Sequence, residues 1–267
     1  MRKTNSFCLL KIIFIFFLPF FLNCISIYNF DKYSRYKKLT IIFTGDINGK
    51  LFPLKNSLKK SSKTEISTGG LTLLSAAINE IKQTCISQNR PFLIFDSGDM
   101  FNFSVFNNYA NRNLLINFIN SVDYDAIAIG NHEFDSGLIN LIELSNNLKT
   151  QYVCANIKPL SNEKFIIENF SKNIFPYVIK ETDSMKIGII GIIDENLTNI
   201  LPVQYRSELS VSPFKILKKI VNNLRSSGCH LIILLSHCGF DPKYPETSPD
   251  YKIAEEIKGI DLILSGH

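Results

Sequence analysis

The sequence predicts an α/β protein built around parallel strands. Five apolar runs are short enough for buried strands, and they occupy residues 39–43, 92–95, 126–129, 231–235 and 261–264. The segments between them carry apolar residues at helical spacing, as expected for strand–helix–strand units. Each run is followed within a few residues by Asp, Asn or His, usually beside a glycine. Parallel sheets carry their ligand-binding groups at the carboxyl ends of the strands, so these polar endings predict a site.

The elements follow in chain order. After the first strand, residues 51–67 are rich in lysine and serine and contain Pro53, which predicts a loop. Gly69-Gly70 opens a helix over residues 71–82, because its apolar positions fall on one face. Residues 100–108 are aromatic and rich in asparagine, and they predict a loop over the site.

The second half of the chain continues the alternation. Helices are predicted at residues 110–122, 138–148, 213–226 and 251–258, with a short strand at 151–156 and a hairpin formed by 177–180 and 186–193. Residues 157–175 show no clear period and predict irregular structure.

Composition excludes several classes of protein. With 45% hydrophobic and 20% charged residues, the chain is globular and not disordered. Its formal charge is +5, but three positive charges (Arg2, Lys3 and Lys11) precede Cys24, which leaves only +2 for the remainder. With no dense basic and aromatic patch, no nucleic-acid partner is expected. The cysteines show no C-x-x-C spacing, which argues against a zinc knuckle or a redox motif.

Residues 1–23 predict a targeting segment. Arg2 and Lys3 precede a nearly continuous Leu, Ile and Phe run that is short for a membrane-spanning helix. The run ends in Phe21-Leu22-Asn23-Cys24, which resembles a bacterial lipoprotein signal with Cys24 as the acylated residue, although Asn23 departs from the usual small residue. Residues 24–38 would then form a polar tether. An uncleaved anchor helix is the alternative, and both place the body on the exported face of the cell membrane or of an outer membrane.

The polar groups after the five runs are those of a metal site. Asp46 and Asn48 follow the first run, Asp99 the second, Asn131 the third, His237 the fourth and His267 the fifth. Isolated Asp or Asn residues often end strands, but five such junctions carrying metal-type ligands predict one converging site.

These residues resemble the calcineurin-like metallophosphoesterases. Gly98-Asp99, Gly130-Asn131-His132-Glu133, Ser236-His237 and Gly266-His267 match that family in order and spacing. Within it, Gly69-Gly70-Leu71 and the continuation of the third motif to Asp135 are most similar to the bacterial 5'-nucleotidase/UDP-sugar hydrolase branch. The resemblance covers residues 39–267 and implies a four-layer α/β/β/α sandwich with two metal ions.

The resemblance also implies roles for individual residues. Asp99 would bridge the two metals, Asp46 would hold the first, and Asn131, His237 and His267 would complete the second. His132 would stabilise the phosphoryl transition state or protonate the leaving oxygen, with Asp135 orienting it. Glu133 is expected to anchor its loop, and Asp96 to form hydrogen bonds at a strand end. Mixed Asp, Asn and His ligands suit Zn, Mn, Fe or Co.

Two departures from the family pattern affect the predicted two-metal site. The first motif is normally Asp-x-His but is Asp46-Ile47-Asn48 here, and the last, Gly-His-x-His, is represented only to His267. Both absent imidazoles belong to the first metal, which leaves Asp46, Asp99 and the carbonyl of Asn48. The sequence therefore predicts one tightly bound metal, a domain whose C-terminal strands are missing, and weak activity.

Three functional hypotheses follow. The leading one is a membrane-anchored, metal-dependent phosphoester hydrolase of 5'-nucleotidase type, favoured by His132 and Asp135. The second is a non-catalytic surface lipoprotein that uses the fold as a binding scaffold, favoured by Asn48. A third is a hydrolase of sulfur esters or cyclic nucleotides acting at the same site.

Overall fold

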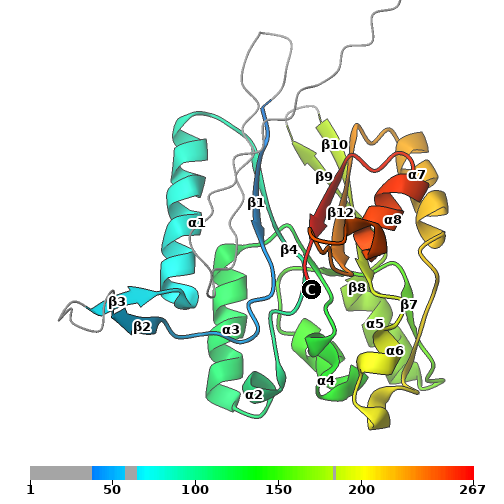
Figure 1. Cartoon of the computed structure of the whole chain (residues 1–267), viewed down its shortest axis with the longest axis horizontal. Helices are drawn as coiled ribbons and strands as arrows, with labels where there is room; N and C mark the ends of the chain where they lie inside the picture. The colour runs from blue at the N-terminus through cyan, green and yellow to red at the C-terminus, as the bar shows by residue number, and fades with distance from the viewer. Residues whose placement is uncertain (1–37, 58–64, 183–184) are drawn as a thin grey trace, which may run out of the picture.

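The protein is an α/β structure in which the predicted strands form two main sheets (Figure 1). The computed structural model describes residues 38–57, 65–182 and 185–267. The predicted leader at residues 1–23, Cys24, and all of the predicted tether at 24–38 except Lys38 lie outside the described residues. Within the described part, none of the helices has both the length and the apolar character needed to cross a membrane.

The first sheet has five parallel strands in the order β1-β4-β5-β6-β8. Its strands are β1 (Thr40–Thr44), β4 (Phe92–Asp96), β5 (Ala126–Ala128), β6 (Tyr152–Val153) and β8 (Ile174–Phe175). The connecting helices are α1 (Gly70–Ser87), α3 (Tyr109–Val122), α4 (Gly137–Ser145) and α5 (Lys164–Asn173). The strand–helix–strand units predicted from the sequence are therefore confirmed.

The second sheet has four strands in the order β13-β12-β10-β9. They are β9 (Tyr177–Thr182), β10 (Met185–Ile193), β12 (Leu231–His237) and β13 (Leu262–Ser265), joined by α7 (Ile216–Ser226) and α8 (Pro249–Glu256). The pair β9 and β10 is antiparallel, as the predicted hairpin requires, whereas β10, β12 and β13 run parallel.

Three clusters of buried apolar residues hold these elements together. One joins the first sheet to residues of α1, α3 and α4, and another joins β10 and β12 to α7 and α8. The third lies between the sheets and includes Ile41, Phe95 and Ala128 from one, with Ile189 and Leu235 from the other. Each sheet contributes mainly to two clusters, one on each of its faces, because successive side chains along a strand point to opposite faces.

Three segments differ from the sequence prediction. Residues 51–67, predicted as a loop, contain β2 (Leu54–Ser57) and part of β3 (Glu65–Thr68), which pair with each other. The predicted loop at 100–108 contains α2 (Phe103–Phe106). Residues 157–175, predicted as irregular, contain β7 (Ile157–Pro159), α5 and β8. Apart from α5, these pieces have only two to four residues each, which is too short for a periodic pattern to show.

The remaining elements are short connections. They are α6 (Leu197–Ile200), β11 (Leu209–Val211), which pairs with β7, and the 3₁₀ turns η1 (His132–Phe134), η2 (Val203–Tyr205) and η3 (Pro245–Thr247). Only η1 bears directly on the site, because it begins at His132.

Candidate metal centre

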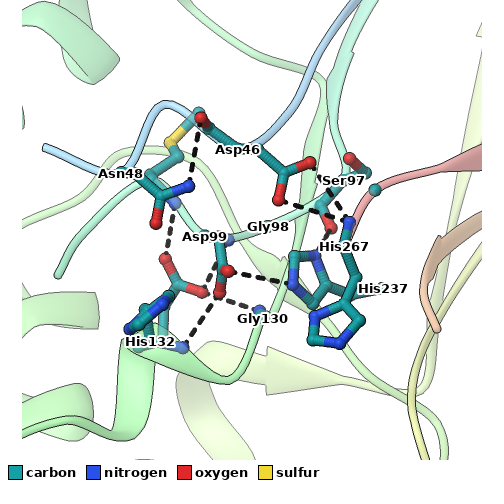
Figure 2. A network of polar contacts seen from close by, with 12 residues as sticks. Asp46, Asn48, Ser97, Gly98, Asp99, Gly130, His132, His237 and His267 are labelled. Carbon is teal, nitrogen blue, oxygen red and sulfur yellow. Dashed lines mark hydrogen bonds and ion pairs between the residues drawn. The ribbon is translucent and has the colours of Figure 1, made fainter. Parts of the chain in front are cut away.

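Four of the residues predicted to form a metal site lie together at the carboxyl ends of strands from both sheets, namely Asp46, Asp99, His237 and His267 (Figure 2). These side chains come from the segments after β1, β4 and β13 and from the end of β12, and the predicted ligand Asn131 lies in the segment after β5. The chain thus assembles the cluster from residues up to 221 positions apart in the sequence.

Asp99 lies at the centre of the cluster and is only 3% exposed. Its Oδ1 accepts a 2.9 Å hydrogen bond from the backbone N–H of His132. Its Oδ2 lies 3.1 Å from Nε2 of His237, close enough for an ion pair. Asp99 therefore connects the loops that follow β4 and β5 with the end of β12.

The orientation of His237 is fixed by a backbone carbonyl. Its Nδ1 lies 2.8 Å from the carbonyl oxygen of Ser97, and a carbonyl can only accept, so Nδ1 carries the proton. This leaves Nε2, the atom facing Asp99, available as a ligand. Sequence reasoning missed the part played by Ser97, because a backbone carbonyl carries no residue signature.

The charges of Asp99 and His237 depend on each other. Burial alone would lower the pKa of His237, but the contact with Asp99 and the charges of Asp99 and Asp46 raise that pKa to about 9. Burial likewise tends to raise the pKa of Asp99, yet His237 and the amide of His132 outweigh it and hold the pKa below its usual value. Asp99 and His237 thus favour each other's charged forms.

His267 completes the cluster from the second sheet. Its ring packs edge-on against that of His237, with the ring centroids 5.1 Å apart. Its backbone N–H lies 3.1 Å from Oδ2 of Asp46, which ties the segment after β13 to the segment after β1 (Figure 2).

The loops that carry the carboxylates adopt an uncommon backbone conformation. Asp46, Asn48 and Asp99 all have positive φ, at 54°, 50° and 56°. The two loops also pair, because the N–H of Asp46 donates to Gly98 at 3.0 Å and that of Asn48 donates to Asp99 at 2.7 Å. Residues held in such conformations gather at functional sites, where surrounding contacts enforce them.

Asn48 faces its own loop. Its Nδ2 donates to the backbone carbonyl of Asp46 at 3.2 Å, and the backbone carbonyl oxygen of Asn48 accepts a hydrogen bond from Nδ2 of Asn102. The side-chain oxygen of Asn48, the group that the sequence suggests as a metal ligand, thus belongs to an amide whose nitrogen is already hydrogen-bonded to the loop.

Glu133, expected to anchor its loop, does so through four backbone groups. Its Oε1 accepts from the N–H of Met100 and Phe101, and its Oε2 from that of Asp99 and Gly130, at 2.6 to 3.2 Å. The side chain is fully buried. Burial and the nearby Asp99 charge raise the pKa of Glu133 to about 7, against these N–H donors, which favour the carboxylate.

Gly98 and Gly130 allow the two loops to approach. A Cβ on Gly130 would lie 2.1 Å from Oδ1 of Asp99 and 2.5 Å from its backbone nitrogen. Gly98 has φ +99°, and a Cβ there would lie 2.6 Å from the nitrogen of Gly130. Glycine is therefore required on both sides of this contact.

His132 and Asp135 form the pair expected from the sequence. Nδ1 of His132 lies 2.9 Å from Oδ2 of Asp135, which also accepts from the N–H of Phe103 at 2.7 Å. The hydrogen bond to Asp135 raises the pKa of His132. The imidazole is 40% exposed, so a side chain held at Nδ1 can present Nε2 to a molecule in solution.

Two other polar residues, Asp96 and His230, form hydrogen bonds to neighbouring strands and loops. Asp96, at the end of β4, accepts from the hydroxyl of Thr44 at 2.6 Å and from the N–H of Gly98 at 2.7 Å. His230, which precedes β12, accepts from the N–H of Lys186 at 3.0 Å.

The donor set at the cluster fits a divalent cation. Ligand atoms of Asp99, His237 and His267 all lie within 4.8 Å of one another. Among the described residues, Nε2 of His237 and Oδ1 of Asn131 are buried polar atoms without an aligned hydrogen-bond partner. Such atoms are costly unless something coordinates or hydrogen-bonds them, and a cation bound at the cluster would use Nε2 of His237.

Comparison with known proteins agrees with this arrangement. Residues 39–267 match the family model for the calcineurin-like phosphoesterase. The chain is 33% identical over 235 residues to the snake venom 5'-nucleotidase of Naja atra, covering 86% of this chain and 41% of that protein.

Solved structures give the same result. The 5'-nucleotidase precursor from Thermus thermophilus superposes with a TM-score of 0.69 at 26% identity, covering 86% of this chain and 41% of that one. The NAD nucleotidase of Haemophilus influenzae gives a TM-score of 0.68 at 25% identity, covering 86% and 38%. This chain thus spans about two fifths of the length of each of these three proteins, and it belongs to the calcineurin-like phosphoesterase family.

Proposed function

We propose that this chain is a metal-dependent phosphoester hydrolase of the 5'-nucleotidase type, exported and anchored to a membrane. The observation that carries the proposal is the joint presence of a cation-binding cluster and the His132–Asp135 pair on neighbouring loops. A scaffold without catalysis has no need for a partly exposed imidazole whose pKa a carboxylate raises.

The residues divide the chemistry between them. Asp99, Asn131, His237 and His267 would hold a divalent cation, with Asp46 beside them. A bound cation would neutralise phosphate charge and lower the pKa of an attacking water. Asp135 holds the imidazole of His132 through Nδ1, so that Nε2 can donate a proton to the leaving oxygen of the ester. Glu133 keeps the two loops at a fixed separation and does not itself touch the substrate.

A nucleotide is the substrate we propose, because the chain is similar to proteins named 5'-nucleotidase. The test compares AMP, UDP-glucose and cyclic nucleotides with the purified chain and Mn²⁺. We expect AMP hydrolysis that stops with a chelator and returns with Mn²⁺. Preference for UDP-glucose or a cyclic nucleotide would move the substrate elsewhere within the family, and no hydrolysis of any substrate would refute the proposal.

One observation favours the second candidate, a non-catalytic binding scaffold. Asn48 replaces the usual imidazole and donates to the carbonyl of Asp46, so the first metal has fewer protein ligands. Amide oxygen is a weaker ligand than imidazole for ions such as Zn²⁺. A chain that binds a metal but hydrolyses none of the esters above would favour this candidate.

The membrane anchor rests on the sequence around Cys24. If lipid is attached there, the membrane fraction contains a chain that begins at Cys24 and has the added mass of acyl groups. A Cys24→Ser variant should leave that fraction. Recovery of an unmodified chain that begins at Met1 would contradict the anchor.

A further inference from the structure

Asp250 joins the two strands that carry the histidines of the cluster. It lies in the first turn of α8, which packs beside β12 and β13 (Figure 1), and it is only 4% exposed. Its Oδ1 accepts from the hydroxyl of Ser236, and its Oδ2 accepts from the hydroxyl of Ser265. Each oxygen of one buried carboxylate therefore contacts a different strand.

The two serines lie opposite each other in the sheet. Ser236 on β12 is paired with Ser265 on β13, and the N–H of Gly266 then donates to the carbonyl of Ser236 at 2.8 Å. Ser236 is followed directly by His237, and Ser265 is separated from His267 by a single glycine. Asp250 thus joins the strands immediately before both ligand positions.

The alternation of side chains along β12 separates Asp250 from the metal cluster. Ser236 points to α8, so the next side chain, His237, points to the opposite face and toward Asp99. Asp250 cannot be a ligand from this position. It can only act through the spacing of the strands, as groups behind the ligands do in metal sites generally.

We propose that Asp250 is a positioning residue that sets the separation of His237 and His267 for metal binding. The inference rests on the proposed metal site and adds a residue that the sequence motifs do not contain. A carboxylate suits the position because two hydroxyl donors meet two acceptor oxygens, which satisfies every partner. An amide offers one acceptor, so one serine must reorient and the two strands are no longer held equally.

Asp261 supplies a matched control within the same pair of strands. It precedes β13, and its Oδ2 accepts from the N–H of Ile232 on β12 at 2.6 Å and from Arg225 at 2.5 Å. It therefore joins β12 and β13 at their amino ends, away from the histidines. Asp261→Asn should weaken the fold in the same way as Asp250→Asn without reaching the metal.

The experiment measures Co²⁺ affinity of the full chain after metal is stripped with a chelator. We expect Asp250→Asn to weaken Co²⁺ binding about 10- to 100-fold and to change the visible absorption of bound Co²⁺. Asp261→Asn should change neither, although both variants should lose thermal stability. Ser236→Ala and Ser265→Ala each remove one hydroxyl with little change in volume, so they provide the test should Asp250→Asn not fold.

Each outcome has a defined meaning. Equal Co²⁺ affinity in the wild type and in the folded Asp250 and serine variants overturns the inference. An equal loss of affinity in Asp261→Asn also overturns it, because the effect would then be general to the strand pair. A wild type that binds no Co²⁺ overturns both this inference and the proposed function. Selective loss in the Asp250 variant, with no hydrolysis of AMP, supports the inference and overturns only the nucleotidase proposal.

Discussion

Replacing Gly130 with alanine tests whether the contact between the loops after β4 and β5 sets the metal site. The added Cβ would lie 2.1 Å from Oδ1 of Asp99, although such contacts are essentially never below 3.0 Å. The loop or the carboxylate must therefore move by about 0.9 Å. The Cβ would also lie 2.5 Å from the backbone nitrogen of Asp99, so rotating the side chain away does not relieve the clash.

The size of the effect follows from this displacement. Overpacking of this kind costs about 1–3 kcal/mol of stability. A shift of about 1 Å in a catalytic group can lower a rate by about 100-fold. Because either movement changes the position of Asp99 relative to the loop after β5, Gly130→Ala should lose Co²⁺ affinity and AMP hydrolysis together while the chain remains folded.

The assay combines thermal unfolding, a Co²⁺ titration and initial rates with AMP and Mn²⁺. Gly228→Ala is the control, because Gly228 has φ +84° but no atom within 4 Å of its added Cβ. Its cost is the left-handed strain alone, about 1–2 kcal/mol, with no change in Co²⁺ affinity. If Gly130→Ala folds and binds Co²⁺ with the affinity of the wild type, the reasoning from this contact is wrong.

Three further experiments have defined outcomes. Burial raises the pKa of Asp96 well above its usual value, so the folded state retains its proton longer than the unfolded state, and stability falls as pH rises above about 4. Asp96→Asn removes this loss, so the stability of the variant relative to wild type should grow by up to about 1.4 kcal/mol per pH unit. The measurement is urea unfolding at several pH values, and a stability difference that does not change with pH would contradict this expectation. His132→Ala should lower kcat about 10²- to 10⁴-fold and Asp135→Asn should lower it by less, with Co²⁺ affinity unchanged in both variants. Equal kcat in the wild type and the two variants would remove His132 from the mechanism. Because Asn48 donates to its own loop, elemental analysis after dialysis should find one tightly bound transition metal per chain, and two would contradict the weak first position.

Much of the fold could be predicted because its strands are continuous apolar runs. The run before Gly130 becomes β5, which is fully buried, and the run before Ser236 becomes most of β12. A parallel strand that is buried on both faces is a continuous apolar run whichever strands it pairs with, so the sequence alone is sufficient to predict it. The helix α5 was missed even though Ile166 and Phe170, four residues apart, form its buried side. The hairpin of β2 and β3 has only four residues in each strand, and its stability depends on pairing that no local pattern records.

In the candidate site, too, the residues that follow apolar runs could be predicted, whereas contacts between separate loops could not. The convergence of Asp99, His237 and His267 could be predicted because each follows or ends an apolar run, and the topology brings such ends together. The sequence also suggested that Asn48 contributes a carbonyl to the metal. Its contacts with Asp46 and Asn102 depend on how two loops fold over each other, which spacing does not reveal.

The residues that support the ligands were the hardest to predict, for a physical reason. A ligand must be of a few residue types, whereas its support needs only an acceptor or a donor at the right place. Ser97 acts through its carbonyl, which every residue has, and Asp250 has the sequence context of an ordinary acid at a helix start. Yet these groups determine which nitrogen of His237 faces Asp99 and how far the two strands that lead to the histidines lie apart. A sequence motif can therefore identify the chemistry of this site, but its metal affinity depends on residues outside the motif.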